Sequence, residues 1–153
     1  MNKMKIAIGN DQHGFEYKKM IMASYPEYSY TDVGSYDAIN TSYPAVAEAA
    51  AKLVASGECE RGILICGTGI GMALTANKVK GCYAAVCHDV YSTERSILSN
   101  NCNVMCMGAL VIGKKTAEYL AGQWLSLNFD SNSASAAKVK QILEVEASQN
   151  ESV

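Results

Sequence analysis

The chain has 153 residues, only two arginines and two histidines, and no long apolar run. Because no apolar stretch is long enough to span a bilayer, we do not expect a transmembrane helix. A net charge of −2 and a pI near 5.7 argue against binding to nucleic acid or to a membrane surface. The apolar segment after the lysines of residues 3–5 is broken at Gly9, which is not typical of a signal peptide. We therefore expect a cytoplasmic protein.

The six cysteines lack the spacing of a metal site. No two are separated as C-x₂-C, and only His13 and His88 could add imidazole ligands, so we expect no metal. Four of the cysteines lie in or beside apolar strand-like runs, where a free thiol behaves as a small apolar side chain: Cys66, Cys82, Cys87 and Cys106. We expect reduced thiols, and only Cys66 is a candidate for chemistry.

Strand and helix patterns alternate along the chain. Strands are predicted over 5–9, 28–33, 62–66, 82–87 and 103–107, and helical spacing follows each of them. This alternation predicts a single domain over 1–147 with a frayed tail over 148–153. The expected fold is a three-layer α/β/α sandwich around a five-stranded parallel sheet with the flavodoxin-like order 2-1-3-4-5. That order brings the loop 10–14 next to the loop 66–71, where open sheets of this kind bind ligands.

The segment 63–71, Ile-Leu-Ile-Cys-Gly-Thr-Gly-Ile-Gly, carries the strongest chemical signal. A buried strand ends in Cys66, and glycines at every second position let backbone N–H groups approach a ligand. The spacing of the glycines does not match the fingerprint of dinucleotide-binding proteins. A nicotinamide-dependent enzyme stays a minor alternative, because Asp89 lies at the end of the next strand, where such enzymes have a ribose-binding acid. Met72 stands where a phosphate-binding P-loop needs lysine and where a cysteine phosphatase needs arginine. A tight strand-to-helix turn without chemistry remains an alternative.

A thiol beside backbone donors and a helix N-terminus suits proton abstraction next to a carbonyl group. Cys66 would take the proton as a thiolate, and loop N–H groups would stabilise the enediolate oxygen. A nucleophilic role would need a neighbouring imidazole, and the sequence does not place His88 there. Asp11 either caps the first helix or accepts a hydrogen bond from a sugar hydroxyl, and Gln12 or His13 could donate one.

Several further motifs occur together with this segment in order: Gly9-Asn10-Asp11, Tyr43-Pro44, Ala76-Asn77-Lys78 and Asn103-Val104. From the first strand to about the fifth helix, the chain resembles the family of ribose-5-phosphate isomerase B and galactose-6-phosphate isomerase. The resemblance implies an aldose–ketose isomerase that uses no cofactor, works as a homodimer or homotetramer, and forms its active sites at the dimer interface.

The resemblance also implies residue roles. Cys66 would be the base that moves a proton between C1 and C2 through a cis-enediol, and Thr68 would act with the loop amides on the enediolate or in ring opening. The other positions that match substrate-binding positions of the family, or lie in its binding segments, are Asp11, Gln12, Tyr43, Gly67, Gly69, Ile70, Gly71, Ser99 and Asn100.

The chain departs from the family pattern where rings are opened and phosphate is held. Gln12 and Ser99 stand where the family has histidines, and His13 is a possible substitute. The family's phosphate-binding arginines are missing, and lysines such as Lys114, Lys115 or Lys138 could replace them only as point charges.

We expect interconversion of ribose 5-phosphate and ribulose 5-phosphate. The alternatives are another pentose, hexose or tetrose, with or without phosphate; a subunit like the B subunit of galactose-6-phosphate isomerase that needs a paralogous partner; and a sugar-binding protein without catalysis.

Overall fold

The computed structural model describes residues 2–39 and 41–150, and within them it has five strands and six helices. The strands are β1 (Lys5–Asn10), β2 (Ser29–Asp32), β3 (Arg61–Cys66), β4 (Ala84–Val86) and β5 (Val104–Gly108). The helices are α1 (Phe15–Ser24), α2 (Tyr43–Ala55), α3 (Ile70–Ala76), α4 (Val90–Leu98), α5 (Lys114–Ser126) and α6 (Ala136–Asn150). Each strand and helix predicted from the sequence is present, although several ends are shifted.

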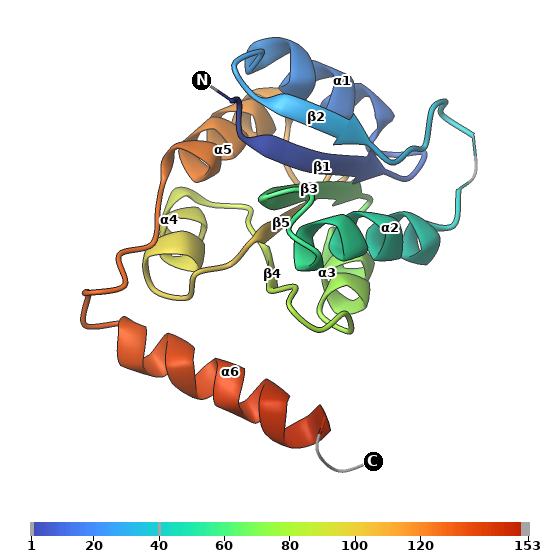
Figure 1. Cartoon of the computed structure of the whole chain (residues 1–153). Coiled ribbons are helices and arrows are strands. Elements are labelled where there is room, and N and C mark those ends of the chain that lie inside the picture. The colour runs from blue at the N-terminus through green and yellow to red at the C-terminus, as the bar shows by residue number, and fades with distance from the viewer. Residues whose placement is uncertain (1, 40, 151–153) are drawn as a thin grey trace.

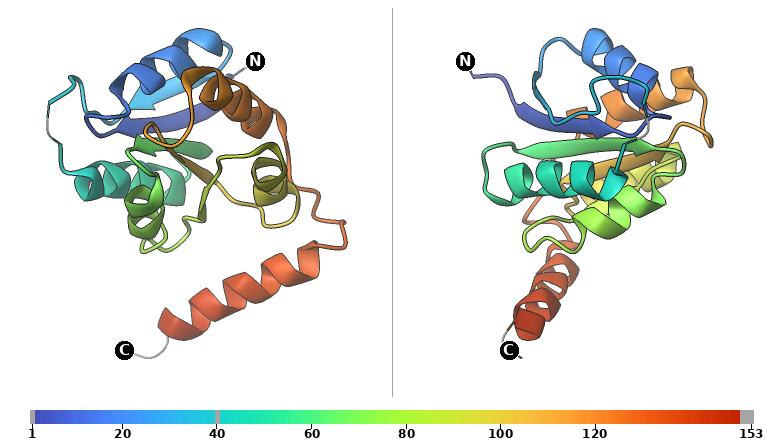
Figure 2. Two further views of the ribbon diagram at one scale, coloured as in Figure 1. Left: turned by 180° about the vertical axis from the view of Figure 1, so that it is seen from behind. Right: turned by 90° about the vertical axis from the view of Figure 1, so that its right-hand side faces the viewer.

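The five strands form one parallel sheet with helices on both faces (Figures 1 and 2). Helices α2 and α3 cover one face, and α1, α4 and α5 cover the other. Each face of the sheet has its own hydrophobic core: the first lies under α2 and α3, and the second lies under α1, α4 and α5. Successive side chains of a strand point to opposite faces, so β3 places Leu64 in the first core and Ile63 and Ile65 in the second. Trp124 of α5 is the largest fully buried side chain of the second core. The predicted three-layer α/β/α architecture is confirmed.

The sheet order is β2-β1-β3-β5-β4, which corrects the predicted order 2-1-3-4-5 at its last two strands. All five residues of β5 are buried, whereas the three residues of β4 are only half-buried. The fully buried β5 therefore lies inside the sheet, between β3 and β4, and the short β4 becomes the edge. The exchange does not affect the switch between β1 and β3, because β2 and β3 still lie on opposite sides of β1.

Helix α6 lies outside the three layers, beyond the segment 127–135 (Figures 1 and 2). The Glu146 carboxylate fastens it to the body by accepting hydrogen bonds from the Gly81 N–H at 3.0 Å and the Tyr83 hydroxyl at 2.7 Å. Residues 148–150, expected in a frayed tail, continue the helix, since no glycine or proline interrupts 136–150. Residues 151–153 lie outside the described residues.

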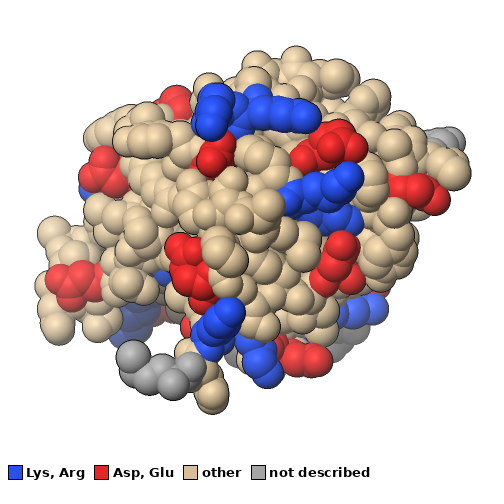
Figure 3. All heavy atoms as spheres, turned by 90° about the horizontal axis from the view of Figure 1, so that it is seen from above, with Lys and Arg blue, Asp and Glu red and all other residues tan. Residues whose placement is uncertain are grey.

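Charged side chains of both signs are interspersed on the face shown in Figure 3, without a broad basic patch there. None of the helices in the described part of the chain has the length and apolarity needed to cross a membrane.

Candidate active site

The two loops predicted to converge at the switch between β1 and β3 do lie together. The Asp11 N–H donates a hydrogen bond to the Ile65 carbonyl at 3.0 Å. A Cβ on Gly14 would lie 2.5 Å from the same carbonyl oxygen, so the close approach of the loops requires glycine at that position. Between the loops is a cavity of about 250 Å³, lined by Asp11, His13, Tyr43, Cys66, Gly67, Thr68 and Gly71.

The thiol of Cys66 is at the carboxyl end of β3 and is almost buried, with 5% of the residue exposed. The Gly69 N–H donates a hydrogen bond to its Sγ at 3.0 Å. Gly69 is also the N-cap of α3, so the first peptide dipoles of that helix begin beside the sulfur. A hydrogen-bond donor and a helix N-terminus both stabilise a thiolate, which is the form of cysteine that acts as a base.

The glycine loop turns sharply from β3 into α3 and packs tightly on its surroundings. Gly69 has φ of +79°, and a Cβ there would lie 2.9 Å from the backbone carbon of Met107 in β5. A Cβ on Gly71 would lie 2.1 Å from Cε1 of Tyr43, whose ring closes one side of the cavity. The loop is thus a tight turn, but it is one that also holds Cys66 and Tyr43 against a cavity.

Thr68 and Ile70 face outward from the loop. Thr68 lines the cavity, and its Oγ1 accepts a hydrogen bond from the Ile70 N–H at 3.3 Å at the start of α3. Ile70 is 56% exposed and does not line the cavity. The hydroxyl hydrogen of Thr68 remains available to donate to a ligand, since Oγ1 is the acceptor in this hydrogen bond.

Asp11 holds the turn before α1 without being the N-cap of that helix, and it also lines the cavity. Its Oδ1 accepts hydrogen bonds from the N–H groups of His13 at 2.9 Å and Gly14 at 3.3 Å, which fixes the turn before α1. The N-cap position of α1 itself is Gly14, without a side-chain cap. The carboxylate also lines the cavity, where it can accept a hydrogen bond from a hydroxyl group. Gln12 points elsewhere, because its Oε1 accepts from the Thr41 N–H at 3.5 Å.

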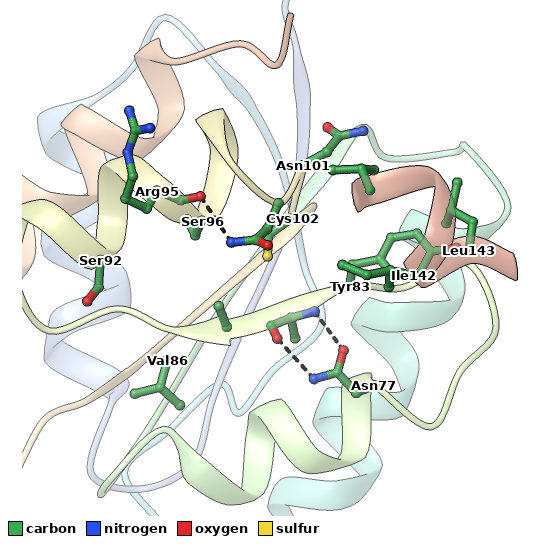
Figure 4. Close-up of a pocket in the computed structure, with 14 residues that line it drawn as sticks. Asn77, Tyr83, Val86, Ser92, Arg95, Ser96, Asn101, Cys102, Ile142 and Leu143 are labelled. Atoms are coloured by element: carbon green, nitrogen blue, oxygen red, sulfur yellow. Dashed lines mark hydrogen bonds between the residues drawn. The ribbon is translucent and has the colours of Figure 1, made fainter. Parts of the chain in front are cut away.

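Ser99 and Asn100 are not brought to this cavity by the fold of a single chain. Both follow α4, where Ser99 Oγ accepts a hydrogen bond from Arg95 Nη1 at 3.1 Å. The amide of Asn100 donates to the Arg95 carbonyl at 3.3 Å. Asn100 borders a different hollow, of about 510 Å³, between α4, β4 and α6 (Figure 4).

This second hollow is mainly apolar. Figure 4 shows Ile142 and Leu143 of α6 beside Tyr83 at one side of the hollow and Arg95 at the other. The side-chain amide of Asn77 accepts a hydrogen bond from the Ala84 N–H at 2.8 Å and donates one to the Ala84 carbonyl at 2.9 Å, in the edge strand β4. Its side chain therefore occupies hydrogen-bonding groups of β4 that another strand would otherwise take.

No arginine or lysine of the described residues lines the 250 Å³ cavity. The guanidinium of Arg61 is used inside the fold, where it donates to the Trp124 carbonyl at 2.8 Å. Arg95 pairs with Glu94 at 2.8 Å, beside the second hollow. Lys115, a candidate for binding an anion, pairs with Glu118 at 3.2 Å. Among the described residues, one chain thus offers a thiol, a carboxylate, an imidazole and hydroxyl groups at the cavity, but no lysine or arginine.

The sequence pattern does not place His88 beside Cys66, but the structure brings it to the strand paired with that residue. Its Nε2 accepts a hydrogen bond from the Gly108 N–H at 2.8 Å, and Gly108 is paired with Cys66 in the sheet register. Burial lowers the pKa of His88, against the opposing effect of the Asp89 carboxylate. The correct order of the last two strands would have revealed this neighbourhood.

A nearly buried thiol with a backbone donor, next to a carboxylate and two hydroxyl groups at a sheet switch point, defines the class: an α/β enzyme suited to proton transfer on a polyhydroxy carbonyl compound. Comparison with known proteins agrees. The family model for ribose/galactose isomerases matches residues 6–142. The chain belongs to the ribose/galactose isomerase family, as its resemblance to that family predicted, and it is an isomerase.

Individual relatives cover almost the whole chain. The D-erythrulose-4-phosphate isomerase 2 of Mycolicibacterium smegmatis is 53% identical over 91% of this chain and 95% of its own length. The ribose-5-P isomerase B of Listeria innocua is 47% identical over 94% of this chain and 97% of its own length. The structure of ribose-5-phosphate isomerase B from Clostridium thermocellum matches with a TM-score of 0.89 and 36% identity, covering 95% of this chain and 99% of that one.

Proposed function

We propose that the protein interconverts ribose 5-phosphate and ribulose 5-phosphate through a cis-enediol, with Cys66 as the base. The observation that carries the proposal is the hydrogen bond from the Gly69 N–H to Cys66 Sγ, inside a cavity that also presents Asp11 and Thr68. The proposed substrate is the one named for the Listeria relative.

The reaction needs one mobile proton and a stabilised oxygen. In the aldose, the Cys66 thiolate removes the proton from C2, and the electron pair of that C–H bond forms the C1–C2 double bond of the enediol. The carbonyl oxygen at C1 gains negative charge, which loop N–H groups and the Thr68 hydroxyl stabilise. The C2 hydroxyl gives its proton to the oxygen at C1, and the thiol returns a proton to C1 as the C2–O bond becomes the carbonyl and the C1–C2 double bond becomes single. Asp11 orients a substrate hydroxyl by accepting its hydrogen.

Deuterium wash-in tests the proton transfer. The wild-type protein in D₂O should introduce deuterium at C1 or C2 of its substrate, and Cys66→Ala should abolish both exchange and isomerisation. Cys102→Ser is the matched control, because that thiol lies at the second hollow and should leave the exchange rate unchanged. The proposal is wrong if Cys66→Ala still exchanges, or if no sugar or sugar phosphate exchanges with the homomeric protein or with a paralogous partner subunit added.

A four-carbon sugar phosphate is a second candidate substrate. The relative from M. smegmatis at 53% identity and one from Pectobacterium atrosepticum at 42% are both named as D-erythrulose-4-phosphate isomerases. Ser99 replaces the histidine that, by the family resemblance, opens the sugar ring. A tetrose esterified at O4 cannot close a five-membered ring through that oxygen, so it would not need this acid. The ratio of kcat/KM for erythrulose 4-phosphate and ribulose 5-phosphate decides between the two substrates.

We also propose a homodimer or homotetramer in the cytoplasm, acting without a cofactor; a heteromer with a paralogous subunit is the alternative. The apolar side chains of Ile70, Leu74, Leu110 and Val111, at and near the glycine loop, are 55–70% exposed. Leu110 lies against Gly67 of the loop, so a second copy that covers these side chains would close the cavity.

A second copy would also supply the groups that one chain lacks at the cavity: Asn100, Ser99 and a cation for the phosphate. Light scattering should show an even-numbered assembly. A Leu110→Glu variant should dissociate the assembly and lower kcat/KM, whereas Val145→Glu, on the 61% exposed position of α6, is the control for added charge. A monomeric protein with full activity would exclude the proposed assembly.

A further inference from the structure

The end of β5 supports the glycine loop directly. A Cβ on Gly108 would lie 2.6 Å from Cα of Thr68 and 2.7 Å from the Gly67 carbonyl oxygen, so the two backbones are in close contact. The carbonyls of Cys66 and Gly67 accept hydrogen bonds from the N–H groups of Ala109 at 2.8 Å and Leu110 at 3.0 Å. A movement of Gly108 would therefore move the peptide units on either side of Thr68.

On the side of β5 that faces β4, the backbone of Gly108 forms a hydrogen bond with a side chain and not with a neighbouring strand. The register between β4 and β5 ends at Val86 and Cys106, so no residue of β4 is paired with Gly108. The Gly108 N–H donates instead to His88 Nε2 at 2.8 Å. The imidazole thus extends the hydrogen bonding of the sheet one step past the end of the edge strand, at the position that carries the loop.

This hydrogen bond exists only while the imidazole is neutral. Nε2 must carry the lone pair, which leaves the proton on Nδ1, and a second proton at Nε2 would set two donors against each other. Burial of the ring lowers the pKa of His88 and keeps the neutral form present at mildly acidic pH. Asp89 is the charged group that acts on the ring among the described residues, and its carboxylate raises the pKa by less than burial lowers it.

We propose that His88 is a positioning residue of the isomerase: its neutral imidazole fixes the Gly108 N–H and thereby the glycine loop that carries Cys66 and Thr68. The residue does not touch the substrate and takes no proton from it. The inference rests on the proposed proton transfer at Cys66 and adds a second condition for it.

Two variants separate the effect of the hydrogen bond from the effect of filling the space of the side chain. In His88→Ala the Gly108 N–H loses its acceptor, and kcat should fall roughly tenfold with little change in KM, as the loss of one supporting hydrogen bond would give. In His88→Gln an amide oxygen can accept the same hydrogen bond but cannot be protonated, so most of kcat should return. Failure of Gln to restore more activity than Ala would overturn the proposal.

The pH dependence gives a readout that a purely structural role would not affect. Dividing the wild-type kcat by the kcat of His88→Gln at each pH cancels every pH dependence that the two proteins share. This ratio should be constant at neutral pH and fall several-fold as His88 gains its second proton. A ratio that does not change with pH would overturn the proposal.

Spectroscopy tests the same contact without a substrate. The chain has only two histidines, so long-range ¹H–¹⁵N spectra can resolve His88, which should be the Nδ1–H tautomer at neutral pH. The backbone amide signals of Gly108 and Thr68 should shift with its titration. An Nε2–H tautomer, or amides that do not follow the titration, would overturn the proposal. If wild type isomerised no sugar, the proposed function would fail, and these spectra would still decide the role of His88.

Discussion

Replacing Gly69 by alanine tests how the glycine loop is held against β5, and Gly57 provides a matched control. Both residues have a positive φ, +79° at Gly69 and +80° at Gly57, so both variants carry the same conformational cost of about 1–2 kcal/mol. A Cβ on Gly57 meets nothing within 4 Å, whereas one on Gly69 lies 2.9–3.1 Å from three backbone atoms of Met107. Met107 lies in β5, a strand with neighbours on both sides, so its backbone atoms cannot move aside easily and the clash adds about 1–3 kcal/mol to the cost.

We therefore expect Gly69→Ala to lower the free energy of unfolding by about 2–5 kcal/mol and Gly57→Ala by about 1–2 kcal/mol. The Gly69 N–H is the donor to Cys66 Sγ, so a displaced loop should also reduce kcat by roughly 10²-fold, whereas Gly57→Ala should leave kcat unchanged. Urea unfolding at one fixed protein concentration and steady-state kinetics measure the two effects. Equal losses of stability in both variants, with full activity in Gly69→Ala, would refute the packing argument.

Three further predictions concern other parts of the molecule. Lys18→Ala should cost about 3–5 kcal/mol in urea unfolding, because the buried ammonium lies 2.9 Å from Asp32, whose charge would lose its partner; a loss below about 1 kcal/mol would contradict this. Gly71→Ala should lower kcat/KM without loss of stability, because the new methyl group displaces the 41% exposed Tyr43 from the cavity while alanine favours the helix; unchanged kinetics would contradict it. Burial raises the pKa of Cys102 to about 12, so this thiol should alkylate slowly at pH 8, as mass spectrometry can measure. Its contribution to stability should decline as the pH rises above ~8.5, because the thiol then ionises in the unfolded chain but not in the folded protein; urea unfolding midpoints at pH 8 and pH 10 check this.

The central part of the site could be predicted from the sequence because it is local. Cys66, Thr68 and the glycines follow one buried strand, and a parallel sheet brings the loop after β1 to the same edge. Asp11 and Tyr43 reach the cavity as expected. Gln12 does not, because its side chain turns to the backbone of Thr41.

The more distant parts could not be predicted, since they depend on which elements become neighbours. Ser99 and Asn100 come before the start of β5, whereas Cys66 is paired with Gly108 at the end of β5, so the parallel sheet places them at opposite edges. Lys18 lies in a helical pattern as an ordinary charged residue, yet the loop after β2 buries it.

The alternation of strands and helices, the parallel sheet and the position of Cys66 at the end of a buried strand follow from the amino-acid sequence, because periodicity and residue type are local properties of the chain. Tertiary structure alone decided that the buried β5 lies beside β3 and that β4 becomes the edge. That order places His88 beside Gly108, which contacts the glycine loop. Strand order depends on the total apolar area that all the layers bury together, and this area cannot be calculated from any one segment of the sequence.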